Sequence, residues 1–236
     1  MTAVVAFISQ KGGVGKSTLA RALAREAASS DLRVKIADLD AEQATCIDWH
    51  KTRMQRGVEP VLAAELFRTV AEAIKAGASH DLLVIDGPAM ASTGTTEIAK
   101  RAHLIVQPTG SGLDDLRPAV RVFHGLVKAG VAKNKLVFAL NHIGTEPEAE
   151  AARAYIQEAG YTVLPGYLPE RPAYRQAQND GLAITETRFA SLKKQADTLI
   201  QALIDRVGEA THGLRKQIET PRRSAKSGRS AGGPRT

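Results

Sequence analysis

The stretch Ser9-Gln10-Lys11-Gly12-Gly13-Val14-Gly15-Lys16-Ser17-Thr18 places three glycines between two lysines. Glycines let successive backbone N–H groups turn toward one anion, and a helix that begins directly after them adds the positive end of its dipole. In such a loop Lys16 lies against the β- and γ-phosphates of a nucleotide, and the hydroxyl of Ser17 binds Mg²⁺. The stretch therefore predicts a nucleotide-binding loop for which ATP is the expected ligand.

The residues on either side of this loop fit a strand followed by a helix. Residues 3–9 are largely apolar, and residues 17–28 are rich in alanine and leucine. The common phosphate-loop pattern G-x-x-x-x-G-K-[ST] is not met, because Gln10 takes the place of its first glycine. Lys11, directly before the glycine pair, makes the motif a deviant Walker A motif. A dinucleotide-binding loop is the nearest alternative, but Thr18 stands where the pattern G-x-G-x-x-G requires a glycine.

Composition indicates one α/β domain followed by a tail. The chain has 236 residues, 43% of them hydrophobic, which is enough to bury one full core. From Arg206 onward eight basic residues stand against two acidic ones, so this end carries nearly all of the net charge of +7. We predict an ATPase domain over residues 1–207 and a basic, disordered tail over residues 208–236. A cationic tail on a nearly neutral body suits a polyanionic partner.

Two further features of the composition narrow the class of protein. No apolar run approaches the length of about 18 residues that a membrane-spanning helix needs, so we expect no membrane as a partner. Cys46 is the only cysteine, which excludes an internal disulfide and a cysteine-rich metal site within one subunit and suits a cytoplasmic protein. We interpret Cys46 as a small apolar residue, and we expect no metal other than Mg²⁺.

Short apolar runs alternate with helical patterns along the body of the chain. Such runs are typical of buried parallel strands, and the stretches between them place apolar residues at helical spacing. We therefore predict a doubly wound α/β fold, with a mostly parallel sheet, helices on both faces and ligands at the carboxyl ends of the strands. The predicted strands are residues 4–8, 34–37, 82–85, 104–106, 136–140 and 162–164. The predicted helices include residues 65–76, 113–129, 146–159 and 186–207.

Acidic residues follow two of the predicted strands. Asp38 and Asp40 come after one strand, and Asp86 ends another directly before a turn. Because the carboxyl ends of parallel strands meet at one edge of a sheet, these carboxylates are expected beside the phosphate loop. A Mg·ATP site needs carboxylates to hold the waters of the metal and to orient the attacking water. The expected metal site comprises Ser17, with Asp38 and Asp86 acting through water.

With these motifs in place, the chain resembles the ParA/MinD family of deviant Walker A ATPases, and most closely the short ParA-type plasmid partition ATPases. The resemblance implies that Lys11 reaches across an ATP-sandwich dimer to the phosphates of the partner subunit. Lys16 and Asp40 are then the other catalytic residues, and Asp40 positions the hydrolytic water. The match covers residues 2 to about 205 and rests on residues 11–18, 38–40 and 84–88, and more weakly on residues 108–116 and 169–186.

The chain departs from the family pattern at the first switch. Many relatives read Asp-x-Asp-Pro-Gln there, whereas Asp40 is followed by Ala41 and Glu42. Other sites are assigned by their position in the chain. The expected contacts of the adenine part of the nucleotide are Asn141, Pro169 and Arg171. The expected DNA contacts are Arg188, Lys193 and Lys194 on the folded body and Arg215, Lys216, Arg222 and Arg223 in the tail.

The resemblance implies an ATPase that forms a homodimer with ATP, binds nonspecific DNA and hydrolyses ATP to drive plasmid or chromosome partition. A ParB-like adaptor or another cargo-linked protein is the expected stimulating partner, and the expected location is the cytoplasm, at the nucleoid. A positioning ATPase for a protein cargo, such as a chemotaxis array or a microcompartment, uses the same chemistry and stays open as the alternative.

Three relatives of the same fold suit the sequence less well. A MinD-like division regulator needs an amphipathic C-terminal helix, and no bulky apolar residue follows Ile218. Iron–sulfur carriers hold their cluster with paired cysteines, whereas Cys46 is alone. A bacterial tyrosine kinase of this fold has a C-terminal tyrosine cluster, but the last tyrosine here is Tyr174.

Overall fold

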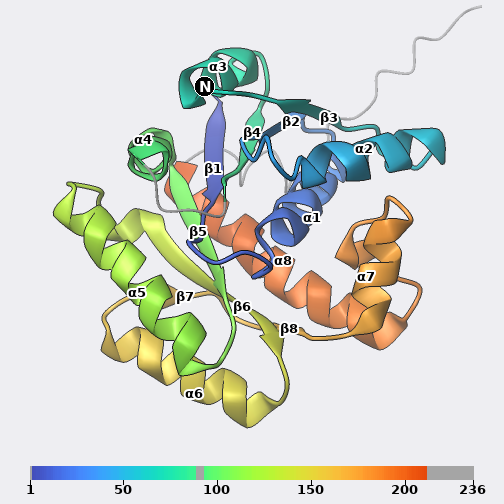
Figure 1. The fold of residues 1–236 in the computed structure, drawn as a ribbon. Coiled ribbons are helices and arrows are strands. Elements are labelled where there is room, and N and C mark those ends of the chain that lie inside the picture. Colours follow the sequence, from blue (N-terminus) through green and yellow to red (C-terminus); the bar gives the residue numbers. More distant parts are fainter. Residues whose placement is uncertain (1, 89–92, 212–236) are drawn as a thin grey trace, which may run out of the picture.

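The computed structural model describes residues 2–88 and 93–211. They form an α/β sandwich around an eight-stranded sheet of order β3-β2-β4-β1-β5-β6-β7, with β8 paired to β6, and all pairings are parallel (Figure 1). The strands are β1 (Ala3–Phe7), β2 (Val34–Asp38), β3 (Ala63–Leu66), β4 (Leu82–Asp86), β5 (Leu104–Thr109), β6 (Leu136–Ile143), β7 (Thr162–Val163) and β8 (Leu168–Pro169). The helices are α1 (Lys16–Ser29), α2 (Thr45–Gln55), α3 (Val70–Gly77), α4 (Thr93–Arg101), α5 (Leu113–Lys128), α6 (Glu146–Glu158), α7 (Pro172–Asn179) and α8 (Ala190–Thr211), with short 3₁₀ helices η1 (Lys133–Lys135) and η2 (Ile184–Glu186).

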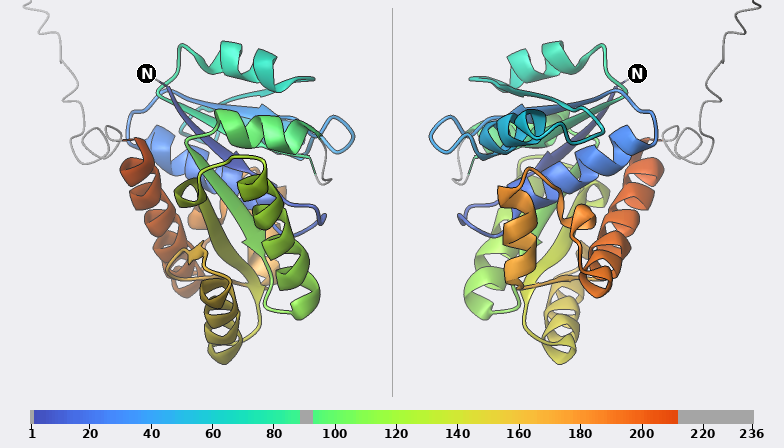
Figure 2. Two further views of the ribbon diagram at one scale, coloured as in Figure 1. Left: turned by 90° about the vertical axis from the view of Figure 1, so that its left-hand side faces the viewer. Right: turned by 90° about the vertical axis from the view of Figure 1, so that its right-hand side faces the viewer.

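The sheet has a hydrophobic core on each face, because successive strand residues point to opposite sides. Val5 and Phe7 of β1 pack into one core with residues of α1, α2, α7 and α8. Val4 and Ala6 pack into the other core with residues of α3, α4, α5 and α6. Figure 2 shows α8 and α5 on opposite sides of the strands. The predicted doubly wound fold is therefore confirmed.

Each of the six stretches predicted as strands matches an observed strand, although 4–8 and 162–164 each run one residue past its end, at Ile8 and Leu164. The predicted helix over residues 65–76 begins too early. Residues up to Leu66 belong to β3, an edge strand that pairs with β2. The helix itself starts at Val70, where the Thr69 hydroxyl accepts the N–H of Glu72 and the Glu72 carboxylate accepts the N–H of Thr69. This capping box is readable in the sequence and marks the start that apolar spacing alone misses.

The predicted helix over residues 186–207 also begins too early, because Glu186 has a different role. It ends η2, and its carboxylate accepts hydrogen bonds from Arg53 Nη1 at 2.7 Å, Arg53 Nη2 at 3.2 Å and the N–H of Ala183 at 2.7 Å. Arg53 is 1% exposed. Burial opposes the ionisation of Glu186, but these hydrogen bonds and the charges of Arg53 and Arg25 outweigh it and lower its pKa. The pair joins α2 to the segment before α8.

The C-terminal end of the fold is formed by α8, which extends to Thr211. Residues 212–236 lie outside the described part of the chain, so the proposed boundary between domain and tail stays a prediction. Within residues 2–88 and 93–211, no helix combines the length and the apolar character that crossing a membrane requires.

We predict that Glu186→Gln lowers the free energy of unfolding by roughly 3 kcal/mol, because it leaves the buried Arg53 without a counter-charge. Since folding lowers the pKa of Glu186 from its ordinary 4.5, its stabilisation is present above about pH 4.5 and is lost as the pH falls further. Urea unfolding of both proteins between pH 3.5 and 7 measures this. Glu209→Gln, in an exposed pair with Arg206, is the control and should change stability by at most about 1 kcal/mol; equal effects of the two substitutions would contradict the prediction.

Candidate nucleotide-binding site

The glycine-rich loop connects β1 to α1 and has a backbone that its glycines alone permit. Gly13 and Gly15 have φ values of +74° and +99°, in the left-handed region. A Cβ on Gly15 would lie 1.9 Å from Nδ2 of Asn141. That amide donates a hydrogen bond to the carbonyl of Val14 at 2.7 Å, and Asn141 is 3% exposed. Asn141, near the end of β6, therefore fixes the position of the loop through this hydrogen bond.

A cavity of about 220 Å³ opens in front of this loop. Its walls bring together predicted residues from three strand ends: the loop glycines with Lys16, Ser17 and Thr18 after β1, Asp40 after β2, and Asp86 at the end of β4. Lys16, in the first turn of α1, is only 8% exposed. A buried ammonium group beside loop N–H groups and a helix N-terminus favours an anion such as a phosphate.

Asp86 is the carboxylate of this site best suited to bind a metal ion. It is 1% exposed, its Oδ2 accepts the thiol of Cys46 at 3.1 Å, and its Oδ1 has no hydrogen-bond partner among the described residues. Burial raises the pKa of Asp86. An unpaired buried carboxylate oxygen and the Ser17 hydroxyl in the wall of one cavity fit Mg²⁺, a hard cation that keeps several of its waters.

Asp38 lies behind the cavity rather than in its wall. Its Oδ1 accepts the N–H of Asp40 and its Oδ2 the N–H of Cys46, both at 3.0 Å, so the carboxylate fixes the loop after β2 and the start of α2. Burial, helped by the neighbouring charge of Asp86, raises the pKa of Asp38 to about 6 despite these two bonds. Its role toward the metal stays a prediction, whereas its two hydrogen bonds to the backbone of this loop are present in the structure.

The loop that Asp38 holds carries Asp40 and leads to Thr45. The Oδ1 of Asp40 accepts the N–H of Gln43 at 3.2 Å, and Asp40 lines the cavity. Thr45, the first residue of α2, donates its hydroxyl proton to Ser17 Oγ at 2.8 Å. The sequence analysis did not single out Thr45. Threonine is favoured at helix starts, so its position shortly after the acidic motif is the signal that would have identified it.

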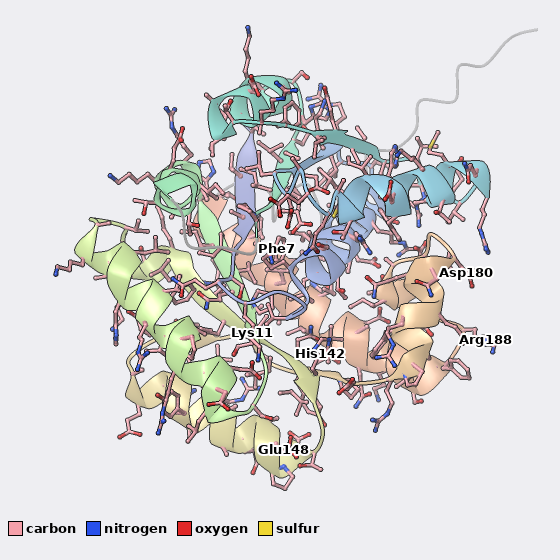
Figure 3. All side chains as sticks on the ribbon, in the orientation of Figure 1. Phe7, Lys11, His142, Glu148, Asp180 and Arg188 are labelled. Carbon is pink, nitrogen blue, oxygen red and sulfur yellow. The ribbon has the colours of Figure 1, made fainter. Side chains whose placement is uncertain are left out.

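Lys11 does not line the cavity of its own loop. Its side chain is 56% exposed, and its ammonium group forms an ion pair with Asp115, near the start of α5. The hydrogen bond from Lys11 to Asp115 and the charge of that carboxylate raise the pKa of Lys11. Figure 3 labels Lys11 near the middle of the face that carries the loop. The two lysines of the motif thus have different surroundings, one buried in the cavity and one outside it.

A second cavity of about 220 Å³ adjoins the first and contains the predicted adenine contacts. Asn141, Pro169 and Arg171 all line it, together with Tyr174 and Gln178 of α7. The two cavities share Gly13, Thr18 and His142. Together they offer a polar compartment that contains Lys16, joined to a more enclosed, partly apolar one, which suits the phosphates and the nucleoside of one nucleotide.

Arg21 links the helices around the site and was not predicted. Its guanidinium group donates to Gln178 Oε1 of α7 and to the carbonyl of Thr45. Its guanidinium carbon also lies 5.5 Å from the ring centroid of Trp49. The guanidinium carbon of Arg53 lies at the same distance from that centroid. Trp49 is 4% exposed and donates its indole N–H to the carbonyl of Leu182. An arginine one helical turn after the phosphate loop gives no sequence signal, because its partners come from α2 and α7.

The predicted DNA contacts on the body are exposed and lie away from the cavity. Arg188 precedes α8, with its guanidinium carbon 5.0 Å from the ring centroid of Phe189, and Lys193 and Lys194 follow in the first turns of that helix. In Figure 3 Lys11 lies near the middle of the view, and Arg188 lies at its edge. The four tail residues predicted to bind DNA, Arg215, Lys216, Arg222 and Arg223, lie outside the described residues.

The fold and the two cavities define a parallel α/β protein whose phosphate-binding loop receives a nucleotide. The chain belongs to the CobQ/CobB/MinD/ParA nucleotide binding domain family, whose model matches residues 5–184. This match confirms the family that the sequence motifs indicated.

Individual relatives cover most of the chain at low identity. The maintenance of carboxysome distribution protein A of Gloeobacter kilaueensis is 26% identical over 186 residues, which are 78% of this chain and 85% of that protein. The septum site-determining protein MinD of Pyrococcus horikoshii, solved with Mg-ADP, has a TM-score of 0.70 at 19% identity, over 89% of this chain and 99% of that one. A Borrelia burgdorferi protein described as a plasmid partition protein, solved with AMPPNP, has a TM-score of 0.67 at 13% identity, over 87% of this chain and 100% of that one. The two solved structures establish likeness of fold.

We predict that Gly15→Ala weakens nucleotide binding at least about tenfold and lowers the free energy of unfolding by about 1–3 kcal/mol, because the new Cβ meets Asn141 and the left-handed φ is strained. Calorimetric titration with ATP and urea unfolding measure the two effects. Gly125→Ala in α5 is the control, since a Cβ there meets nothing within 4 Å. A Gly15→Ala protein that binds nucleotide as tightly as this control would show that the loop tolerates another backbone.

Proposed function

We propose that this protein is an ATP-hydrolysing switch that dimerises around bound ATP and positions a cargo. One observation carries the proposal: the loop has two lysines in different surroundings. Lys16 is 8% exposed and lines the cavity of its own loop, whereas Lys11 is exposed outside that cavity. A phosphate loop needs one lysine for its own nucleotide. The second is therefore available to the nucleotide of a second subunit.

The residues of the cavity support ATP hydrolysis by positioning and electrostatics. Lys16 and the loop N–H groups stabilise the negative charge that develops on the γ-phosphate. Asp40, in the wall of the cavity, orients a water molecule for attack. Mg²⁺ bound at Ser17 and Asp86 would neutralise charge on the β- and γ-phosphates. Lys11 of the second subunit would add a cation to each site, so hydrolysis and dimerisation depend on each other.

The hydrogen bonds around Asp40 support a switch. Asp38 joins the N–H groups of Asp40 and Cys46, so the cavity wall and the start of α2 move as one unit. Thr45 connects that unit to Ser17, beside the γ-phosphate position. Loss of the γ-phosphate would therefore change the position of α2. This helix lies on the surface of the molecule (Figure 1), where a partner can contact it.

The relatives bear on the kind of cargo. The relative from Gloeobacter kilaueensis is named for carboxysome distribution, and its sequence likeness extends over 78% of this chain. The likeness to the plasmid partition protein is one of fold. We therefore favour a protein cargo, with plasmid or chromosome partition as the second candidate. In both cases nonspecific DNA at the nucleoid would be the surface along which the cargo is placed, and a cargo-linked or ParB-like protein would stimulate hydrolysis.

We predict that Lys16→Ala abolishes ATP binding, whereas Lys11→Ala retains ATP binding within about fivefold but fails to dimerise with ATP and loses hydrolysis. The reason is that Lys16 faces its own cavity and Lys11 does not. Calorimetry, light scattering with ATP and phosphate release measure the three properties. Lys128→Ala, which removes an exposed lysine at the end of α5, is the control. A Lys11→Ala protein that dimerises and hydrolyses ATP like the control would disprove the proposed sandwich dimer.

We predict that nonspecific duplex DNA binds only in the presence of ATP and that binding falls steeply with salt, because phosphate contacts release counterions. Replacing Arg188, Lys193 and Lys194 together by alanine should weaken DNA binding about tenfold and flatten the salt dependence without changing ATP binding. The control replaces Lys100, Arg121 and Lys128, which are exposed on α4 and α5.

Retention of DNA with ATP, with ADP and without nucleotide, over a series of salt concentrations, is the measurement for this prediction. Equal retention in all three states would contradict control by ATP. Retention in none of them would exclude DNA as the surface and leave the cargo protein as the partner of the switch.

A further inference from the structure

His142 is an extra residue in the last strand pairing of the sheet. In the pairing of β6 with β8, Asn141 is opposite Leu168 and Ile143 is opposite Pro169, so two steps along β6 correspond to one along β8. His142 is therefore the bulged residue, and its φ of +57° lies in the left-handed region. Glycine is the residue that most readily adopts such a φ, and bulges re-aim a side chain next to functional sites.

The imidazole lies where the two cavities meet. His142 is exposed and lines both the cavity in front of the phosphate loop and the cavity beside α7. Of the residues that the structure describes, only Gly13 and Thr18 also line both. Figure 3 shows His142 near the middle of the face, close to the phosphate loop. The bulge turns this side chain toward the ligand site, whereas the preceding residue, Asn141, is buried and bonded to Val14.

Backbone strain alone would not assign a role, since histidine adopts the left-handed region more readily than most residues do. Asp31 shows this, because it has a φ of +61° and lines neither cavity. What separates His142 from Asp31 is the position of the side chain. Strain retained beside a ligand site, at a position where glycine would be relaxed, is typical of a side chain that the site uses.

We propose that His142 contacts the bound nucleotide where its triphosphate joins its nucleoside, by donating a hydrogen bond to an oxygen of the ribose. The inference rests on the proposed binding of ATP across the two cavities and adds a contact that neither the glycine-rich loop nor the acidic motifs supply. A nucleoside diphosphate or triphosphate contains this junction, and inorganic tripolyphosphate lacks it. His142 thus makes the site respond to the nucleoside as well as to the phosphates.

The test compares His142→Gly with the unsubstituted protein in calorimetric titrations with ATP, ADP and inorganic tripolyphosphate. We expect ATP and ADP to bind about tenfold more weakly and tripolyphosphate to bind within about twofold of the unsubstituted protein. The melting temperature without ligand should rise by about 2 °C, because glycine adopts this φ without strain. His142→Ala should lose the same affinity, which separates loss of the imidazole from added flexibility of the loop.

Asp31→Gly is the matched control, since it relaxes a similar φ at an exposed position away from both cavities. It should raise the melting temperature to a similar extent and leave the affinity for ATP unchanged. Unchanged ATP affinity in His142→Gly would overturn the proposal. An equal loss for tripolyphosphate would overturn it too, because the contact would then be to a phosphate and not to the ribose. If the unsubstituted protein bound none of the three probes, the proposed function itself would fail, which is a different result.

Discussion

Parallel pairing in one register places Phe7, Asp86 and Asp38 in a single row across the sheet. At that row β1, β4 and β2 end, and each chain segment turns into a loop at the same edge. A slip of one residue would reverse the face to which every side chain points, and it would separate the carboxylates from the phosphate loop. The cavity therefore exists because the strands of the apolar core pair in this register.

Burial of charge at this edge has to be compensated locally. Asp38 is 0% exposed and keeps its place by accepting two backbone N–H groups, while Asp86 accepts the thiol of Cys46. The positive charges of Lys16 and Arg21, both buried, favour the ionised form of Asp86. Cys46 is buried, as expected of a small core residue, but its thiol also has a polar partner. The core and the site thus share residues, and substitutions here affect stability and ligand binding together.

Sequence reasoning located what is local and missed what is distant. The glycines, Lys16 and the strand-terminal carboxylates follow from short motifs, because one strand and one loop determine their geometry. The ion pair of Lys11 with Asp115 joins positions 104 residues apart, and the link from Arg21 to Gln178 joins positions 157 apart. No local pattern encodes such pairs. The edge strand β3 was missed for a related reason, since its pairing with β2 decides its conformation.

Trp49 is the only tryptophan in the chain, and the guanidinium carbons of Arg21 and Arg53 each lie 5.5 Å from its ring centroid. Arg21 comes from the helix that follows the phosphate loop, and Arg53 is tied to Glu186, before α8. Indole emission depends on nearby charge and on exposure to solvent. The protein therefore contains a single indole at the contact between the phosphate loop's helix and α2, and a rearrangement that moves either guanidinium group changes its emission without an added label.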